Sequence, residues 1–243
     1  MDDISAAKIL INSLDLTSLN STDDDDSIKA LCQKAFTPYG NTASICIYPQ
    51  FIHYAKTILP KDFKIATVIN FPVGAPNIQL MQKEISTAIK FGADELDVVL
   101  PYRSLLAGNI DFCQEYLAET RKASLNKTLK IIIESGELKK IELIKLATKL
   151  CIDANANFVK TSTGKTDVSA TPEAANVILE TIAQSNKNVG FKASGGIKTF
   201  EDAKKYLTLC QAIMGPNWIN PSHFRLGASS VLTNLLNKIK QGY

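Results

Sequence analysis

The feature that most constrains the fold of this chain is a regular alternation of short apolar stretches with longer segments of helical periodicity. Eight stretches have the length of strands. Several are continuous runs rich in Val and Ile, which is typical of strands buried on both faces. The eight are Ser13–Leu16, Ser44–Ile47, Ile65–Ile69, Glu95–Leu100, Leu129–Ile133, Asn157–Lys160, Val189–Lys192 and Phe224–Gly227.

Helical patterns fill the intervals between these stretches. The segment Ile78–Phe91 repeats apolar residues at helical spacing and stops before Gly92, a typical C-terminal signal. In Thr171-Pro172-Glu173 the threonine is suited to cap a helix and the proline to begin it. The other helical segments are Asp23–Ala35, Asp111–Leu125, Glu137–Ile152, Thr199–Leu209 and Ser230–Ile239.

This order of strands and helices predicts an α/β protein: a single (β/α)₈ TIM barrel with a short N-terminal helix, occupying residues 1–243 as one domain. Such a barrel commonly uses about 250 residues. The alternative is an open doubly wound sheet, which usually has a glycine-rich turn after the first strand if it binds a dinucleotide. Here the first strand leads into Asp15-Leu16-Thr17-Ser18, which contains no glycine.

Composition limits the partners and the compartment. A formal net charge of only +3 argues against a strong attraction to nucleic acid or to an anionic membrane. No apolar run approaches the roughly 18 residues of a membrane helix, and Met1-Asp2-Asp3 lacks the basic start of a secretory signal. The five cysteines are widely spaced without a CxxC pair, so we expect reduced thiols in a cytoplasmic protein, with neither disulfides nor a zinc site.

Two lysines stand where a barrel gathers its active residues, at the C-terminal ends of strands. Lys160 ends one strand and Lys192 ends the next, so we expect both side chains to point into the same mouth. A single lysine after a strand is usually a solvated residue of the rim. Two such lysines, each followed by small residues and glycine, favour a functional role.

The chemistry that suits this pair is Schiff-base formation. An amine attacks a carbonyl only when it is unprotonated, and free lysine titrates near ~10.4. Desolvation and a second cation both lower that pKa, so we expect Lys192 to activate Lys160 as the nucleophile. Asp97 shares a strand face with Glu95 and Val99, so it is expected to project inward and to relay protons. Taken alone, such an aspartate is often only a structural partner of a cation.

Glycine-bearing loops follow the last three strands: Gly164-Lys165, Gly195-Gly196 and Gly227-Ala228-Ser229-Ser230. Glycines let backbone N–H groups approach an anion closely. The two serines would open the last helix, whose N-terminus attracts phosphate. Because the loops after strands seven and eight form the recurrent phosphate site of these barrels, we expect a phosphorylated substrate. The alternative is that the glycines only turn the chain.

Once these residues are placed, the chain resembles the deoxyribose-phosphate aldolase family over nearly its whole length, from Leu14 to Tyr243. The lysine-bearing segments are the most specific part of the resemblance. The segments that carry it are Gly40–Pro49, Ala66–Pro72, Gly92–Val99, Ile132–Leu138, Val159–Lys165, Gly190–Gly196 and Arg225–Ser230.

The resemblance implies reversible cleavage of 2-deoxy-D-ribose 5-phosphate to acetaldehyde and D-glyceraldehyde 3-phosphate, with no metal and no organic cofactor. It implies that Lys160 forms the Schiff base while Asp97 and Lys192 relay protons. Family members are often dimers, so a homodimer is expected.

Other positions follow from the same resemblance. Asp15, Thr17 and Asn70 are expected to contact the substrate. Some relatives have a C-terminal tyrosine that reaches the site, and this chain ends in Tyr243. Cys46 either lines the pocket or is a buried structural thiol.

Two alternative functions use the same residues. One is a lysine-dependent aldolase or transaldolase that takes a longer ketose phosphate, and the other is a phosphosugar-binding barrel without catalysis. The context of the lysines argues against the first, and the presence of Lys160, Lys192 and Asp97 together argues against the second. His53 and His223 have no cluster of potential ligands nearby in the sequence, so we expect packing or surface roles and no metal.

Overall fold

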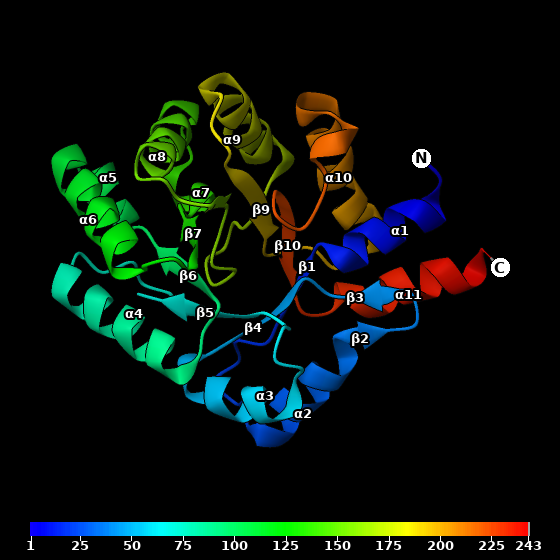
Figure 1. The fold of residues 1–243 in the computed structure, drawn as a ribbon. Helices are drawn as coiled ribbons and strands as arrows, with labels where there is room; N and C mark the ends of the chain where they lie inside the picture. The colour runs from blue at the N-terminus through cyan, green and yellow to red at the C-terminus, as the bar shows by residue number, and fades with distance from the viewer. Residues whose placement is uncertain (243) are drawn as a thin grey trace.

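A computed structural model describes residues 1–242, in which eight parallel strands close into a barrel surrounded by helices (Figure 1). The predicted α/β fold class, a (β/α)₈ barrel, is confirmed. In hydrogen-bonded order the barrel runs β1 (Leu14–Thr17), β10 (Phe224–Ala228), β9 (Gly190–Ser194), β8 (Phe158–Lys160), β7 (Thr128–Ile132), β6 (Glu95–Val99), β5 (Ile65–Ile69) and β4 (Ser44–Ile47), which pairs again with β1.

The helices lie outside the barrel strands. The longer ones are α1 (Asp3–Asn12), α2 (Asp25–Lys34), α3 (Ile52–Ile58), α4 (Ile78–Phe91), α6 (Ile110–Ala123), α8 (Ile141–Asp153), α9 (Pro172–Ser185), α10 (Phe200–Met214) and α11 (Val231–Gln241). Shorter elements are α5 (Tyr102–Leu106), α7 (Ser135–Leu138), a hairpin of β2 (Phe36–Thr37) with β3 (Gly40–Asn41), and 3₁₀ turns at Pro49–Phe51 and Pro216–Trp218.

The expected N-terminal helix is present as α1, which packs beside α10 and α11 (Figure 1). Helix ends follow the local signals in the sequence. The side chain of Thr171 accepts a hydrogen bond from the N–H of Ala174, and Pro172 begins α9. Gly92 ends α4 with φ 101°, a conformation that glycine adopts without strain.

Two helical expectations differ from the structure. The segment predicted as one helix, Glu137–Ile152, is divided into α7 and α8, because Lys139 has φ +58° and interrupts the helical backbone. The helix α3 was not expected. Its seven residues are too few to display a helical repeat of apolar positions.

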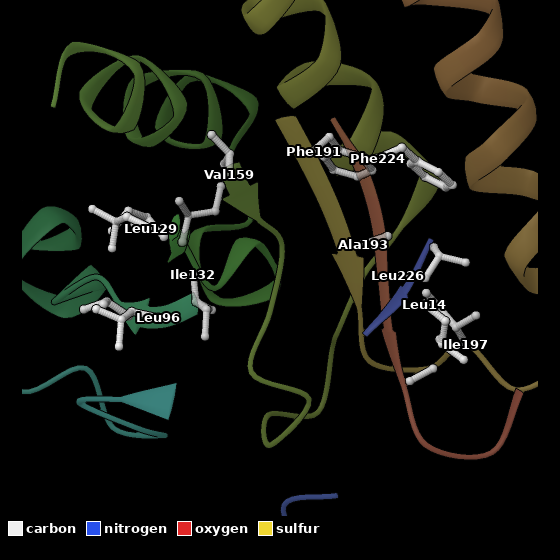
Figure 2. Close-up of a cluster of buried hydrophobic side chains, with 14 of the residues drawn as sticks. Leu14, Leu96, Leu129, Ile132, Val159, Phe191, Ala193, Ile197, Phe224 and Leu226 are labelled. Carbon is white, nitrogen blue, oxygen red and sulfur yellow. The ribbon is translucent and has the colours of Figure 1, made fainter. Parts of the chain in front are cut away.

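Alternation along each strand separates an apolar layer from a charged interior. Val159 and Phe191 precede Lys160 and Lys192, so their side chains leave the opposite face of the strand. Figure 2 shows such side chains, including Leu96 of β6, between the strands and the surrounding helices. This layer forms the main hydrophobic core. The inward-facing positions are therefore free to carry charged groups.

Within residues 1–242, no helix combines the length and the apolar character that crossing a membrane requires.

Candidate active site

The strand order brings Lys160 and Lys192 together in the barrel interior. They are opposite each other in the register of β8 and β9, and both side chains are buried. Nζ of Lys160 lies 2.8 Å from Oδ2 of Asp97, and Nζ of Lys192 lies 2.7 Å from the same oxygen. One carboxylate oxygen of β6 thus joins the two amines.

The pKa of Lys160 is lowered from its usual value. Burial is the largest cause, because it disfavours the charged amine. Asp97 acts in the opposite direction, while the neighbouring Lys192 lowers the pKa further. Asp97 is shared with other cations, so its attraction for this amine does not outweigh burial and repulsion. Lys160 therefore tends towards the unprotonated form that attacks a carbonyl.

Lys192 is held in its protonated form, and Asp97 is held in its ionised form. Burial lowers the pKa of Lys192, but the carboxylates of Asp15 and Asp97 outweigh it and raise the pKa above the ordinary value. Burial raises the pKa of Asp97, but the lysines around it hold the value far below its usual range. The site thus combines an amine with a lowered pKa, an ionised carboxylate and a protonated ammonium within hydrogen-bonding distance.

A second tier of charges lies deeper in the barrel. Nζ of Lys130 is 2.9 Å from Oδ1 of Asp97 and also contacts Glu95 and Asp15. Arg225 pairs with Glu95 at 3.0 Å and with Asp15. Lys130 and Asp15 are fully buried, and Glu95 and Arg225 are nearly so.

Our sequence reasoning did not identify Lys130 or Arg225. A signal was available, because each is a single cation within an otherwise apolar strand. Isolated buried charges are very unfavourable, so such a residue requires a partner on another inward-facing position. Only the closed barrel shows which partner it has: Lys130 is opposite Asp97 in the strand register, and Arg225 reaches Asp15 and Glu95.

The network contains four cationic side chains, Lys130, Lys160, Lys192 and Arg225, and three carboxylates, Asp15, Glu95 and Asp97. With all of them ionised the cluster would carry one excess positive charge. Of these seven groups, all within residues 1–242, only Lys160 lines the pocket at the barrel mouth. Loss of its proton balances the cluster, which agrees with the lowered pKa of this lysine.

The pocket has a volume of about 210 Å³, below the roughly 300–1,000 Å³ of sites for drug-sized ligands. Lys160 is at its inner end. Its lining includes most of the residues predicted to bind the substrate or its phosphate, namely Thr17, Gly164, Lys165, Gly195, Gly196, Gly227, Ser229 and Ser230. The volume suits a short substrate.

The loops fit one another closely at this end of the pocket. Gly164, Gly195 and Gly196 have φ values of 76°, 85° and 78°, which suit glycine. A Cβ on Gly227 would lie 3.0 Å from Cε of Lys192, so this glycine makes room for the buried lysine. The side chain of Ser230, the N-cap of α11, makes no capping hydrogen bond to the described part of this helix. The backbone N–H groups in the first turn of α11 are therefore suited to bind an anion.

Comparison with known proteins agrees with this arrangement. The sequence model of the DeoC/LacD family aldolases matches residues 9–215. The chain belongs to the DeoC/LacD aldolase family. It is therefore an aldolase, and Lys160 of the buried lysine pair lines the pocket at its barrel mouth.

Solved structures share the fold of this aldolase. A protein from Coccidioides immitis, provisionally assigned as a deoxyribose-phosphate aldolase, is 27% identical with a TM-score of 0.84, over 95% of this chain and 86% of that one. One from Toxoplasma gondii ME49 with the same provisional assignment is 22% identical (TM-score 0.90, 98% and 95% covered). The deoxyribose phosphate aldolase from Aeropyrum pernix, described as tetrameric, is 21% identical (TM-score 0.77, 100% and 98% covered).

Some residues expected at the substrate lie elsewhere in the aldolase. Asp15 is fully buried beneath the pocket and does not line it. Its carboxylate forms ion pairs with Lys192 and Arg225 and accepts a hydrogen bond from the hydroxyl of Ser44. Its carboxylate is occupied by the charge network. Thr17 does line the pocket, and its hydroxyl donates to the carbonyl of Asp15 at 2.8 Å.

The side chain of Asn70 is likewise hydrogen-bonded to other parts of the protein. Its Nδ2 donates to the carbonyls of Ala75 and Val99 and to the hydroxyl of Tyr116, while its Oδ1 accepts from the N–H of Ala75. These bonds hold the turn after β5, at which Asn70 has φ 56°. The side chain is thus committed to the turn and does not line the pocket.

Cys46 is buried in a small apolar cluster with Leu19, Ala66 and Val68 and does not line the pocket. Burial raises the pKa of its thiol. Tyr243 lies outside the described residues. Within residues 1–242, no group of His, Cys, Asp and Glu is arranged to hold a metal ion. His223 stacks on Trp218, with ring centroids 5.3 Å apart.

Proposed function

We propose that this aldolase cleaves 2-deoxy-D-ribose 5-phosphate reversibly to acetaldehyde and D-glyceraldehyde 3-phosphate through a Schiff base on Lys160. The observation that carries the proposal is a buried lysine with a lowered pKa at the inner end of a small pocket, whose outer part is lined with glycine loops and a helix N-terminus. The names of the structural relatives from three organisms support the choice of substrate.

The reaction begins when the neutral amine of Lys160 attacks the aldehyde carbon of the open-chain sugar. Loss of water gives an iminium, which accepts the electron pair as the bond between C2 and C3 breaks. Asp97, which is ionised before this step, accepts the proton that leaves the C3 hydroxyl, with water as the intermediary. D-glyceraldehyde 3-phosphate departs, and an enamine of acetaldehyde stays on Lys160.

Lys192 supplies the complementary proton. Its raised pKa keeps it protonated, and it shares Oδ2 of Asp97 with Lys160. A proton therefore moves between the three groups without crossing open solvent. Protonation of the enamine at carbon and hydrolysis of the new iminium release acetaldehyde and restore Lys160.

The phosphate binds at the opposite end of the pocket. Backbone N–H groups of Gly164 and Gly196 and the α11 N-terminus at Ser229 and Ser230 provide a cradle for an anion, beside Gly195 and Gly227, which pair with each other at the end of the β9–β10 ladder. Lys165 adds a positive charge. The cavity of about 210 Å³ favours a five-carbon chain over a longer ketose phosphate, and a comparison of cleavage rates with fructose phosphates tests this preference.

The deciding experiment traps the Schiff base. Sodium borohydride added with acetaldehyde should reduce an iminium to a stable secondary amine, and peptide mass mapping should locate it on Lys160. Lys160→Leu should abolish both the adduct and the cleavage of deoxyribose phosphate while circular dichroism keeps the native spectrum. An adduct on another lysine, or turnover by the folded variant, would refute the assignment of the nucleophile.

We further propose that residues 1–243 act as one domain, that the enzyme is a cytoplasmic homodimer, and that its partners are small phosphorylated sugars and not nucleic acid or membrane. Closure of all eight strands around one interior supports the first point. Five free, buried cysteines support a reducing compartment. Light scattering tests the dimer, and a tetramer like that described for the Aeropyrum pernix protein would contradict it.

A further inference from the structure

Glu134 is a buried carboxylate outside the catalytic set proposed above. It follows β7, is 0% exposed and has φ 52°, in the left-handed region that non-glycine residues seldom adopt. The backbone on both sides is tied to the end of β8. The N–H of Ile133 donates to the carbonyl of Lys160 at 3.0 Å, and that of Ser135 donates to Thr161 at 2.9 Å. This turn fixes the direction of the Glu134 side chain.

The carboxylate holds the loop that follows β8. It accepts hydrogen bonds from the N–H of Thr163 at 3.2 and 3.3 Å, from the hydroxyl of Thr163 at 2.6 Å and from the hydroxyl of Thr166 at 3.3 Å. The Thr163 hydroxyl in turn accepts from the N–H of Lys165 at 3.1 Å. One buried carboxylate therefore organises the backbone from residue 163 to residue 166.

That loop forms one wall of the phosphate end of the pocket. Thr163, Gly164 and Lys165 line the pocket, whereas Glu134 does not. Gly164 lies against the next loop so closely that a Cβ on Gly195 would be 3.1 Å from the Cα of Gly164. A displacement of the first loop would consequently widen the cradle between the two glycines.

The short helix α7 is fitted to the same loop. A Cβ on Gly136 would lie 2.0 Å from the carbonyl oxygen of Val168, so the helix and the loop backbone are in direct contact. The fit places the carboxylate of Glu134 beneath Thr163 rather than in solvent. Burial raises the pKa of Glu134, while its bonds to Thr163 act in the opposite direction.

From these contacts we infer that Glu134 is a positioning residue for phosphate recognition: it holds Gly164 and Lys165 opposite Gly195 without touching the substrate. The inference rests on the proposed function only for the identity of the phosphorylated substrate. It predicts a defect limited to ligands that carry a phosphate.

The test compares Glu134→Gln with a matched control, Glu137→Gln, which removes the same charge three residues later on α7. KM and kcat are measured for 2-deoxy-D-ribose 5-phosphate and for unphosphorylated 2-deoxy-D-ribose. We expect Glu134→Gln to raise KM for the phosphorylated sugar on the order of tenfold, the size of a lost hydrogen bond to a charged group, with kcat near that of the unmodified enzyme. Its kcat/KM for the unphosphorylated sugar should equal that of the control.

A second pair of variants guards against a folding defect. Thr163→Val removes the hydroxyl that bonds Glu134 and should reproduce the same selective rise in KM. Thr163→Ser keeps the hydroxyl and should recover most of the affinity. An equal loss with both sugars, or no rise in KM with the phosphorylated one, overturns the inference.

If the unmodified protein does not cleave deoxyribose phosphate, the proposed function fails, and inorganic phosphate becomes the probe. Its dissociation constant is measured by calorimetry for the unmodified protein, Glu134→Gln and Glu137→Gln. Weaker binding by Glu134→Gln alone supports the positioning role. Equal binding by all three proteins, or no binding by the unmodified one, overturns it.

Discussion

Replacement of Lys192 by methionine tests the electrostatic part of the mechanism. The amines of Lys160 and Lys192 lie 2.8 and 2.7 Å from the same oxygen of Asp97, so they are at most about 5.5 Å apart. At an effective dielectric constant near 20, two unit charges at this distance repel by about 3 kcal/mol, which corresponds to about 2 pKa units. Without Lys192, Asp97 also attracts Lys160 more strongly. Both effects raise the pKa of Lys160.

The assay is the pH dependence of borohydride trapping with acetaldehyde, read by mass spectrometry. Trapping requires the neutral amine, so its midpoint in Lys192→Met should move upward by about 2 pH units relative to the unmodified enzyme. Lys192→Arg keeps a cation and should leave the midpoint close to the original. A Lys192→Met protein that is folded, judged by near-ultraviolet circular dichroism, but has an unshifted midpoint would refute the reasoning.

Two further predictions concern packing and acid stability. Gly227→Ala places a Cβ 2.9 Å from Cβ of Ser194 and 3.0 Å from Cε of Lys192, so we expect kcat to fall while the circular dichroism spectrum is retained; an unchanged kcat would contradict the close fit. Asp15 and Asp97 have pKa values below those of the unfolded chain, so their stabilisation is complete above about pH 4 and is lost as pH falls through the folded-state values. Urea titrations below about pH 4 measure how steeply the free energy of unfolding rises with pH. In Asp97→Asn this slope should be lower than in the unmodified protein by up to about 1.4 kcal/mol per pH unit, and an unchanged slope would exclude this contribution.

The fold was accessible from the sequence because parallel barrel strands are buried on both faces. The stretch Ile65–Ile69 is apolar except for Thr67, and its observed ends agree with the predicted ones. Short elements were less accessible. The break between α7 and α8 depends on the left-handed backbone of Lys139, which no helical propensity of this residue indicates.

Lys160 and Lys192 could be located from the sequence because each precedes a glycine loop; Lys160 ends β8 as expected, whereas β9 continues for two residues beyond Lys192. Lys130 and Arg225 could not be assigned partners in the same way. Their ion pairs join strands that are distant in the sequence, such as Arg225 with Glu95. The expected substrate contacts of Asp15 and Asn70 illustrate the same limit, since strand position alone does not distinguish a pocket residue from one bonded beneath it.

By itself, the sequence determined the order of strands and helices, the alternation that turns one face of each strand inward, and the loops that carry glycine. These properties are local, because they depend on the spacing of residues a few positions apart. Only the tertiary structure decided that Lys160 is the network cation that reaches the pocket and that burial and the neighbouring Lys192 lower its pKa. A pKa depends on every charge nearby and on the loss of water, and both are fixed only when the barrel closes.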